Sequence, residues 1–180
     1  MLGLLIGAAL GTSGALIQAL TRNPLADPGI LGVNAGASFF VLIAVGYLGM
    51  TSLQSYIWFA FLGAIITTVM VYVVGSSGRN GATPVTLTLA GVAIGAILGG
   101  VSTALTLLNP TAFDRMRFWA AGALSGGTYE AVTTVAPFLI VGLLLAVLMA
   151  RPLNAVALGD DLAKSLGANI VRVRTVVVIA

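Results

Sequence analysis

Residues 7–36 read GAALGTSGALIQALTRNPLADPGILGVNAG, and this stretch decides how the rest of the chain is organised. It holds the end of one apolar helix, a short polar turn with one Arg, one Asp and two prolines, and the start of another apolar helix. Asn23-Pro24 ends the first helix, because proline disfavours the helical conformation of the residue before it. Asp27 is placed to cap the second helix, with Pro28 at its first position. The pattern predicts a tight loop between two membrane spans.

The composition of the 180 residues indicates a membrane protein. Hydrophobic residues make up 59% of the chain and charged residues only 7%, whereas soluble domains have about 25% charged residues. The longest apolar runs have the length that crosses the hydrocarbon core of a bilayer, about 20 residues. An all-α, polytopic transmembrane helical bundle is therefore expected. This apolar character excludes a nucleic-acid-binding protein despite the net charge of +3.

Five full spans and the start of a sixth are expected in a single membrane domain. The full spans cover residues 1–20, 30–48, 57–74, 87–108 and 132–149, and the sixth begins at about 171–180. Arg151-Pro152 is expected to end the fifth span. A short outer helix is expected over about 112–120, and two short cytoplasmic helices over about 154–167. The apolar run that starts at Thr175 indicates a fragment of a longer protein.

Small and polar residues share single faces of several expected spans. Glycines recur at every fourth position in the first and fourth spans, at Gly3, Gly7 and Gly11 and at Gly91, Gly95 and Gly99. This spacing lets a neighbouring backbone approach closely. Asn34 in the second span and Ser102 in the fourth are polar side chains that need a partner inside a membrane. Asn34 either bonds to another helix or lines a polar pathway. The fourth span, with its glycine face and Ser102, either lines a path or is simply tightly packed.

The longest linker between spans contains a basic and aromatic segment. Arg115, Arg117 and Trp119 follow a capping-box-like start at Thr111–Asp114, which predicts a short interfacial helix. Such a segment either anchors in lipid headgroups or forms a gate or a partner-docking edge.

A second polar segment follows the fifth span. Three leucines at every fourth position form a narrow apolar stripe, at Leu158, Leu162 and Leu166. Gly159 is expected to break the helix, Asp160 to cap its continuation and Gly167 to close it. The segment is either an ordinary amphipathic loop or a knob that docks in a groove of a partner.

The basic residues orient the spans. Loops on one side hold Arg22, Arg79, Arg151, Lys164, Arg172 and Arg174, and loops on the other hold only Arg115 and Arg117. The positive-inside rule places the first set in the cytoplasm. The turn at Asn23–Asp27 and the segment around Asp160 are then cytoplasmic, and the Arg115–Trp119 segment is outside.

The sequence holds no pattern for catalysis or for metal binding. It contains no His and no Cys, no paired-carboxylate site and no Gly-rich phosphate loop with its Lys. A proton-driven carrier is disfavoured, because no ionisable residue is expected in mid-membrane. The chain is therefore expected to be a pore or carrier subunit, with no cofactor, that takes its energy from a partner.

Four stretches, in order, resemble the FecCD family of ABC transporter permeases, which import ferric siderophores, haem and vitamin B12. The stretches are Gly14–Ala37, Leu89–Gly95, Phe118–Gly127 and Leu158–Gly167. The resemblance implies a ten-span fold in which these five spans are the second to the sixth, so the first span and spans eight to ten are missing. It also implies a second permease subunit, two cytoplasmic ATPase subunits and a periplasmic or lipid-anchored substrate-binding protein. The implied location is the bacterial cytoplasmic (inner) membrane.

The resemblance also implies roles for individual residues. Asn23 and Leu25 match the loop that forms the cytoplasmic gate, and Thr83 matches a second constriction. The stretch Gly159–Gly167 matches the surface that seats in a groove of the ATPase. The turn TRNPLADP and the segment FDRMRFW look most like those of ferric-siderophore importers. A structural or assembly subunit without a path, and a passive channel, are the alternative functions.

Overall fold

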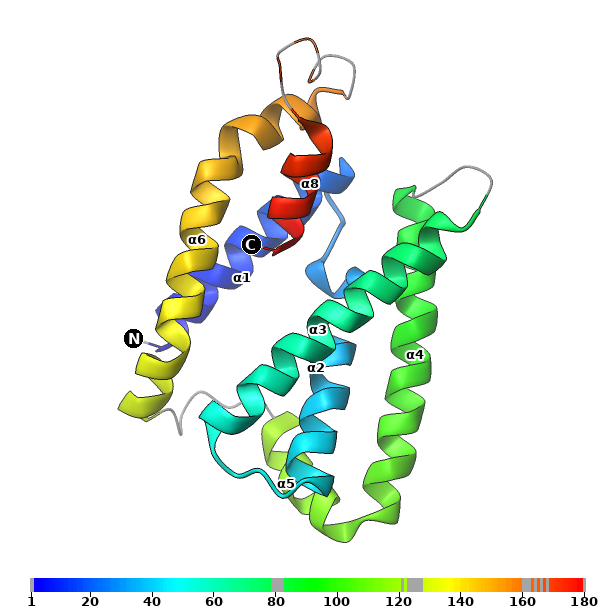
Figure 1. Cartoon of the computed structure of the whole chain (residues 1–180), viewed down its shortest axis with the longest axis vertical. Helices are drawn as coiled ribbons and strands as arrows, with labels where there is room; N and C mark the ends of the chain where they lie inside the picture. The colour runs from blue at the N-terminus through cyan, green and yellow to red at the C-terminus, as the bar shows by residue number, and fades with distance from the viewer. Residues whose placement is uncertain are drawn as a thin grey trace. The chain divides into compact units, whose positions relative to one another are not determined.

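The computed structural model describes residues 2–78, 83–120, 122, 128–159, 163, 165, 167 and 169–179. Every regular element within these residues is helical (Figure 1). The elements belong to two compact units. The first unit combines Met1–Pro28 with Gly127–Ala180, and the second is the continuous segment Gly29–Gly126.

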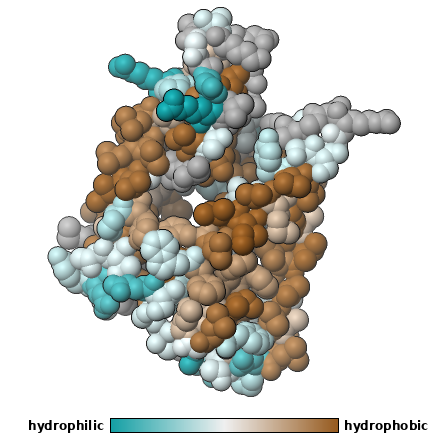
Figure 2. All heavy atoms as spheres, in the orientation of Figure 1, coloured by the Kyte–Doolittle hydropathy of each residue, from teal (hydrophilic) through white to brown (hydrophobic). Residues whose placement is uncertain are grey.

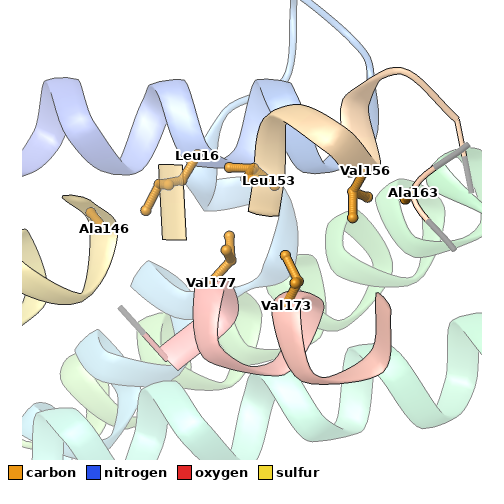
Figure 3. Packing of buried hydrophobic residues seen from close by; sticks show 7 residues of the cluster. All are labelled: Leu16, Ala146, Leu153, Val156, Ala163, Val173 and Val177. Atoms are coloured by element: carbon orange, nitrogen blue, oxygen red, sulfur yellow. The ribbon is translucent and has the colours of Figure 1, made fainter. Parts of the chain in front are cut away.

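Three helices of the first unit lie within the described residues. They are α1 (Leu2–Thr21), α6 (Tyr129–Ala157) and α8 (Ile170–Ile179). α1 and α6 pack against each other, and α8 packs against both. Figure 3 shows their buried apolar cluster, which consists of Leu16, Ala146, Leu153, Val156, Ala163, Val173 and Val177. The cluster therefore joins the last turns of α1 to the last turns of α6.

Arg151-Pro152 does not end the fifth helix, because α6 continues through Pro152 to Ala157. A proline inside a helix removes one hydrogen bond of the ladder and costs about 3 kcal/mol. Leu153 and Val156 follow the proline, and both are buried in the cluster. Their packing holds the added turn in place.

The second unit contains a bundle of apolar helices. Its elements are η1 (Pro28–Leu31), α2 (Val33–Leu42), η2 (Ile43–Tyr47), α3 (Leu53–Ser76), α4 (Pro84–Leu108) and α5 (Pro110–Ala120). η1 is a 3-10 helix and η2 is a π-helix that continues α2. α2 packs against α3 and α4, which also pack against each other (Figure 1). α5 packs against η2 and α4.

The second apolar stretch begins differently from the prediction. The 3-10 turn comes first, and the N-cap of α2 is Gly32, with a left-handed φ of 72°. Pro28, predicted to take the first position of the second helix, begins the 3-10 helix η1, and α2 itself starts after Gly32. An ideal Cβ at Gly32 would lie 2.8 Å from Cγ2 of Thr67 on α3. Both the backbone conformation and the close approach of α3 thus favour glycine here.

Glycines bring the helices of the second unit close together. A Cβ at Gly36 of α2 would collide with the carbonyl of Gly63 on α3. A Cβ at Gly91 of α4 would collide with the carbonyl of Ile30. An ideal Cβ at Gly99, two turns further along α4, meets no described atom within 4 Å. Only part of the predicted glycine face of α4 is therefore used for packing.

Among the described residues, four helices are long and apolar enough to cross a membrane. They are α1, α3, α4 and α6, and the apolar helix Val33–Tyr47 is shorter. Figure 2 shows apolar side chains over α3 and α4. Large exposed apolar residues there include Trp58, Ile65, Val69, Val85, Leu89 and Val92. An apolar outer surface of this kind on several long helices is that of a multi-pass membrane protein.

Candidate functional site

The turn after α1 is built by its own polar groups. The N–H of Ala26 donates to the carbonyl of Asn23 at 3.1 Å, and the N–H of Leu25 donates to Oδ1 of Asn23 at 2.9 Å. Pro24 takes the second position of this turn, which its fixed φ suits. Nε2 of Gln18 donates to the carbonyl of Ala26 at 3.4 Å and ties the turn to α1. The Leu25 side chain is 88% exposed, so a stiff turn presents an apolar side chain outward.

Arg22 forms the junction between α1 and this turn. The N–H of Asn23 donates to the carbonyl of Gln18 at 3.1 Å, which is the outer bond of a Schellman helix end. Arg22 lies between them with a left-handed φ of 54°, where glycine is the usual residue. Its Nε and Nη2 both donate to the carbonyl oxygen of Val156 on α6, at 3.1 and 2.5 Å. The side chain therefore holds the end of α1 against the end of α6.

The end of α6 leads into the predicted docking segment. Leu158 is 71% exposed, and Gly159 has a φ of 131°, a conformation that favours glycine. The N–H of Ala163 donates to the carbonyl of Gly159 at 2.9 Å, and Ala163 is fully buried in the cluster of the first unit. Gly167 also has a positive φ, of 79°. Asp160, Leu162 and Leu166 lie outside the described residues.

Three other predicted path residues belong to the second unit. Thr83 caps α4, because its Oγ1 accepts from the N–H of Thr86 at 3.2 Å and its own N–H donates to Oγ1 of Thr86 at 3.0 Å. Thr83 and Pro84 thus give α4 a capping residue followed by a proline at its first position. Ser102 is half-buried on the same helix, about 28 Å from Thr83 along the axis at 1.5 Å per residue. Asn34 is exposed in the first turn of α2.

The basic segment forms α5, whose start is capped by Asn109. Oδ1 of Asn109 accepts from the N–H of Ala112 at 3.1 Å, so this cap replaces the one expected at Thr111. Arg117 lies 3.6 Å from the carboxylate of Asp114, with both side chains exposed. Trp119 lies in the last turn of α5.

Three side-chain hydrogen bonds join the π-helix η2 to α4, to α5 and to the junction between them. Nη1 of Arg115 donates to the carbonyl of Val45 at 2.8 Å, and Nδ2 of Asn109 donates to that of Gly46 at 3.3 Å. The hydroxyl of Tyr47 donates to the carbonyl of Leu105 at 2.9 Å. Carbonyls at a helix end lack partners within the helix and attract cations. Arg115 is therefore bound to the protein itself and not only available to headgroups.

Sequence reasoning missed the residues that make these contacts. It used Arg22 only to orient the spans, and it gave no role to Gln18, Asn109 or Tyr47. The partner of Arg22 is 134 residues away in the chain, so no local pattern reveals it. The dipeptide Asn109-Pro110 does carry a signal, because asparagine caps helices and proline follows the cap.

The described residues hold no group of three or more His, Cys, Asp or Glu side chains that could bind a metal. The candidate sites are instead the hydrogen-bonded turn with the exposed Leu25, the bend at Gly159 after α6, and the hydrogen-bonded contacts of α5 with η2.

Known proteins are similar to this chain over nearly its whole length. The FecCD transport family matches residues 1–180. The chain belongs to this family. The FecCD chain is similar to the ferric enterobactin transport system permease protein FepD of Escherichia coli, with 46% identity over 179 residues, 99% of this chain and 53% of that protein. It is also similar to the Fe(3+)-citrate import system permease protein YfmD of Bacillus subtilis, with 41% identity over 98% of this chain and 52% of that protein.

A solved structure supports the fold of the FecCD chain. It is that of a metal-chelate type ABC transporter in an inward-facing conformation, which matches with a TM-score of 0.82 at 24% identity. The match covers 98% of this chain and 56% of the other. The FecCD chain spans about half the length of the curated relatives it matches.

Proposed function

We propose that the chain is a permease subunit of an ATP-driven importer of ferric siderophores in the bacterial cytoplasmic (inner) membrane. The observation that carries this proposal is the similarity, along nearly the whole chain, to permeases named for ferric enterobactin and Fe(3+)-citrate. A permease named for cobalamin is 34% identical over 97% of this chain. Iron complexes are therefore the favoured cargo.

The proposed assembly is that of the family. The chain contributes five spans to a ten-span permease, which pairs with an identical or a related permease subunit. Two ATPase subunits bind on the cytoplasmic side and hydrolyse ATP, and the permease itself is not an enzyme. A periplasmic or lipid-anchored binding protein delivers cargo to the outer side, where Arg115, Arg117 and Trp119 of α5 form part of its docking edge. The exposure of Arg115 and Arg117 supports this role.

Two segments receive roles in transport. We name the turn Asn23–Ala26 the gate turn, and residues 158–167 the coupling segment. Leu25 is exposed on a turn that is held by its own hydrogen bonds, and this supports a gate, because a side chain that closes a path must be held in a fixed position. The exposed Leu158 before the bend at Gly159 supports docking to the ATPase. The proposed ATPase contacts are Leu158, Gly159, Asp160, Leu162, Leu166 and Gly167. In addition to the gate turn, the proposed path residues are Asn34, Thr83 and Ser102.

Radio-iron uptake tests the proposal. Cells carry the full-length permease with its ATPase and binding protein, with or without an ATPase-inactivating substitution, and receive ferric catecholate, hydroxamate and citrate complexes, haem or labelled vitamin B12. We expect one iron complex to enter and its entry to stop in the ATPase-inactive cells. Entry of vitamin B12 alone would reassign the cargo. Entry that ignores the ATPase would favour a passive channel, and no entry of any compound would favour a structural subunit.

A further inference from the structure

One backbone oxygen connects the start of the gate turn to the start of the coupling segment. Arg22, which directly precedes the gate turn, donates to the carbonyl oxygen of Val156 from Nε and Nη2 at 3.1 and 2.5 Å. The N–H of Gly159, at the bend of the coupling segment, donates to the same oxygen at 3.1 Å. The two segments are thus linked through a single acceptor.

Packing holds one side of this link, and backbone hydrogen bonds hold the other. Val156 has no exposed surface and is packed in the cluster that also contains Ala163 of the coupling segment. On the other side, the bond from Asn23 to Gln18 closes the end of α1, and the bond from Ala26 to Asn23 closes the gate turn. A displacement of the last turn of α6 can therefore reach the gate turn through packed and hydrogen-bonded groups alone.

The chemistry of the contact suits arginine. A planar guanidinium presents N–H groups in a fixed fork, so two of them meet one oxygen, whereas an ammonium is a point charge on a flexible stem. The acceptor belongs to the last turn of α6, where the helix dipole attracts a cation. Arg22 keeps this contact from a left-handed backbone position that glycine would occupy more easily. Unfavourable backbone conformations of this kind cluster at functional positions, which indicates a role for the Arg22 side chain.

We propose that Arg22 is a positioning residue that transmits movement of the coupling segment to the gate turn. The inference rests on the proposed function, because it requires an ATPase that moves one segment and a gate formed by the other. When the coupling segment is displaced, Val156 moves with Gly159, and the guanidinium carries the gate turn with it. Without the guanidinium, ATP hydrolysis continues but no longer moves the gate turn.

The test replaces Arg22 by glycine in the full-length permease, reconstituted in liposomes with its ATPase and binding protein. Glycine adopts the left-handed conformation without strain, so R22G removes the side chain and retains the turn. The chain has no cysteine, so Leu25→Cys, with any other cysteine of the complex replaced, reports the gate turn. Its labelling by a membrane-impermeant maleimide is measured with and without ATP, beside ATP hydrolysis and iron uptake.

We expect R22G to retain ATP hydrolysis, to lose the ATP-dependent change in labelling at position 25, and to lower uptake by about tenfold or more, because hydrogen bonds from charged groups are among the stronger ones. R22K keeps the charge but not the forked N–H groups of the guanidinium. Its uptake and its labelling change are expected to lie between those of R22G and those of the unaltered protein. Arg151→Gln removes the same charge from an exposed position on α6 and is expected to change none of the three readouts.

The outcomes separate this inference from the proposed function. An R22G complex with unaltered uptake and an unaltered labelling change would overturn the role of Arg22 while leaving the importer intact. If R22G does not assemble, R22K decides, and full uptake with a full labelling change in R22K would overturn the role. An unaltered complex without ATP-dependent uptake would overturn the proposed function, and the inference with it.

Discussion

Gly91 and Gly99 show how two residues of one pattern come to have different consequences. Both lie on α4 at the every-fourth spacing that predicts a packing face. The carbonyl of Ile30 occupies the space where a side chain at Gly91 would begin, whereas the space at Gly99 is free of described atoms within 4 Å. The spacing identifies the face correctly, but it does not tell where along the face the neighbouring backbone lies.

Gly91→Ala is expected to destabilise the permease, because the added methyl group must push α4 away from the backbone at Ile30. Overpacking of this kind costs about 1–3 kcal/mol. Gly99→Ala is the matched control, since the same substitution on the same helix meets open space and gains up to about 1 kcal/mol of helix propensity. The thermal unfolding midpoint of the purified full-length permease in detergent should fall for Gly91→Ala and hold or rise for Gly99→Ala. Equal midpoints would show that the approach at Gly91 is not tight.

At the scale of elements, local signals predicted the helices well and their ends less well. The dipeptide Thr83-Pro84 does mark the start of α4, because the cap and the proline act within one turn. Pro152 fails to end α6, because Leu153 and Val156 are held by residues far away in the chain. The expected second span is divided into η1, α2 and η2 for a similar reason, since contacts with α3 decide the backbone near Gly32. Tertiary packing overrides local preference at these positions.

In the candidate site, too, the local features could be predicted from the sequence and the long-range contact could not. The resemblance to a family identified Asn23 and Leu25, and the hydrogen bonds of their turn follow from Asn and Pro alone. The link from Arg22 to Val156 depends on how α1 packs against α6, which no short stretch of sequence specifies.

Leu158→Asp is expected to reduce ATP-dependent uptake strongly without loss of the protein from the membrane. The side chain is 71% exposed, so a charge there leaves the core of the first unit intact. A carboxylate would, however, be costly to bury in an apolar groove of the ATPase. Asn154→Asp places the same charge one turn earlier at another exposed position and is expected to transport normally. Uptake and the amount of ATPase that copurifies are measured together, and normal values for Leu158→Asp would remove this residue from the docking surface.

At the scale of the whole molecule, loops of the second unit are expected on opposite sides of the membrane. At 1.5 Å per residue, the 25 residues of α4 extend about 37 Å, which is more than the thickness of the hydrocarbon core of a bilayer. The two ends of α4 are therefore expected on opposite faces of the membrane. Single cysteines at Ser77 and Thr111, both exposed, should therefore react with an impermeant thiol reagent from opposite faces.

The positive-inside rule predicts that Ser77→Cys is labelled from the cytoplasm and Thr111→Cys from outside. Labelling in right-side-out and inverted vesicles separates the two faces, and Leu25→Cys should behave like Ser77→Cys. If Ser77→Cys and Thr111→Cys reacted from the same face, α4 would not cross the membrane.

The arrangement of the first unit also affects how the protein is made. Arg22 and Val156 are 134 residues apart, and a ribosome that adds about 5–20 residues per second needs about 7–27 s to synthesise the chain between them. During that time α1 has left the ribosome without the helix that covers Leu16. The contacts described within Gly29–Gly126 join residues of one continuous segment, so they can form earlier. The helices of this middle segment can therefore pack first, and α1 stays in the bilayer without its partner α6 until α6 has been made.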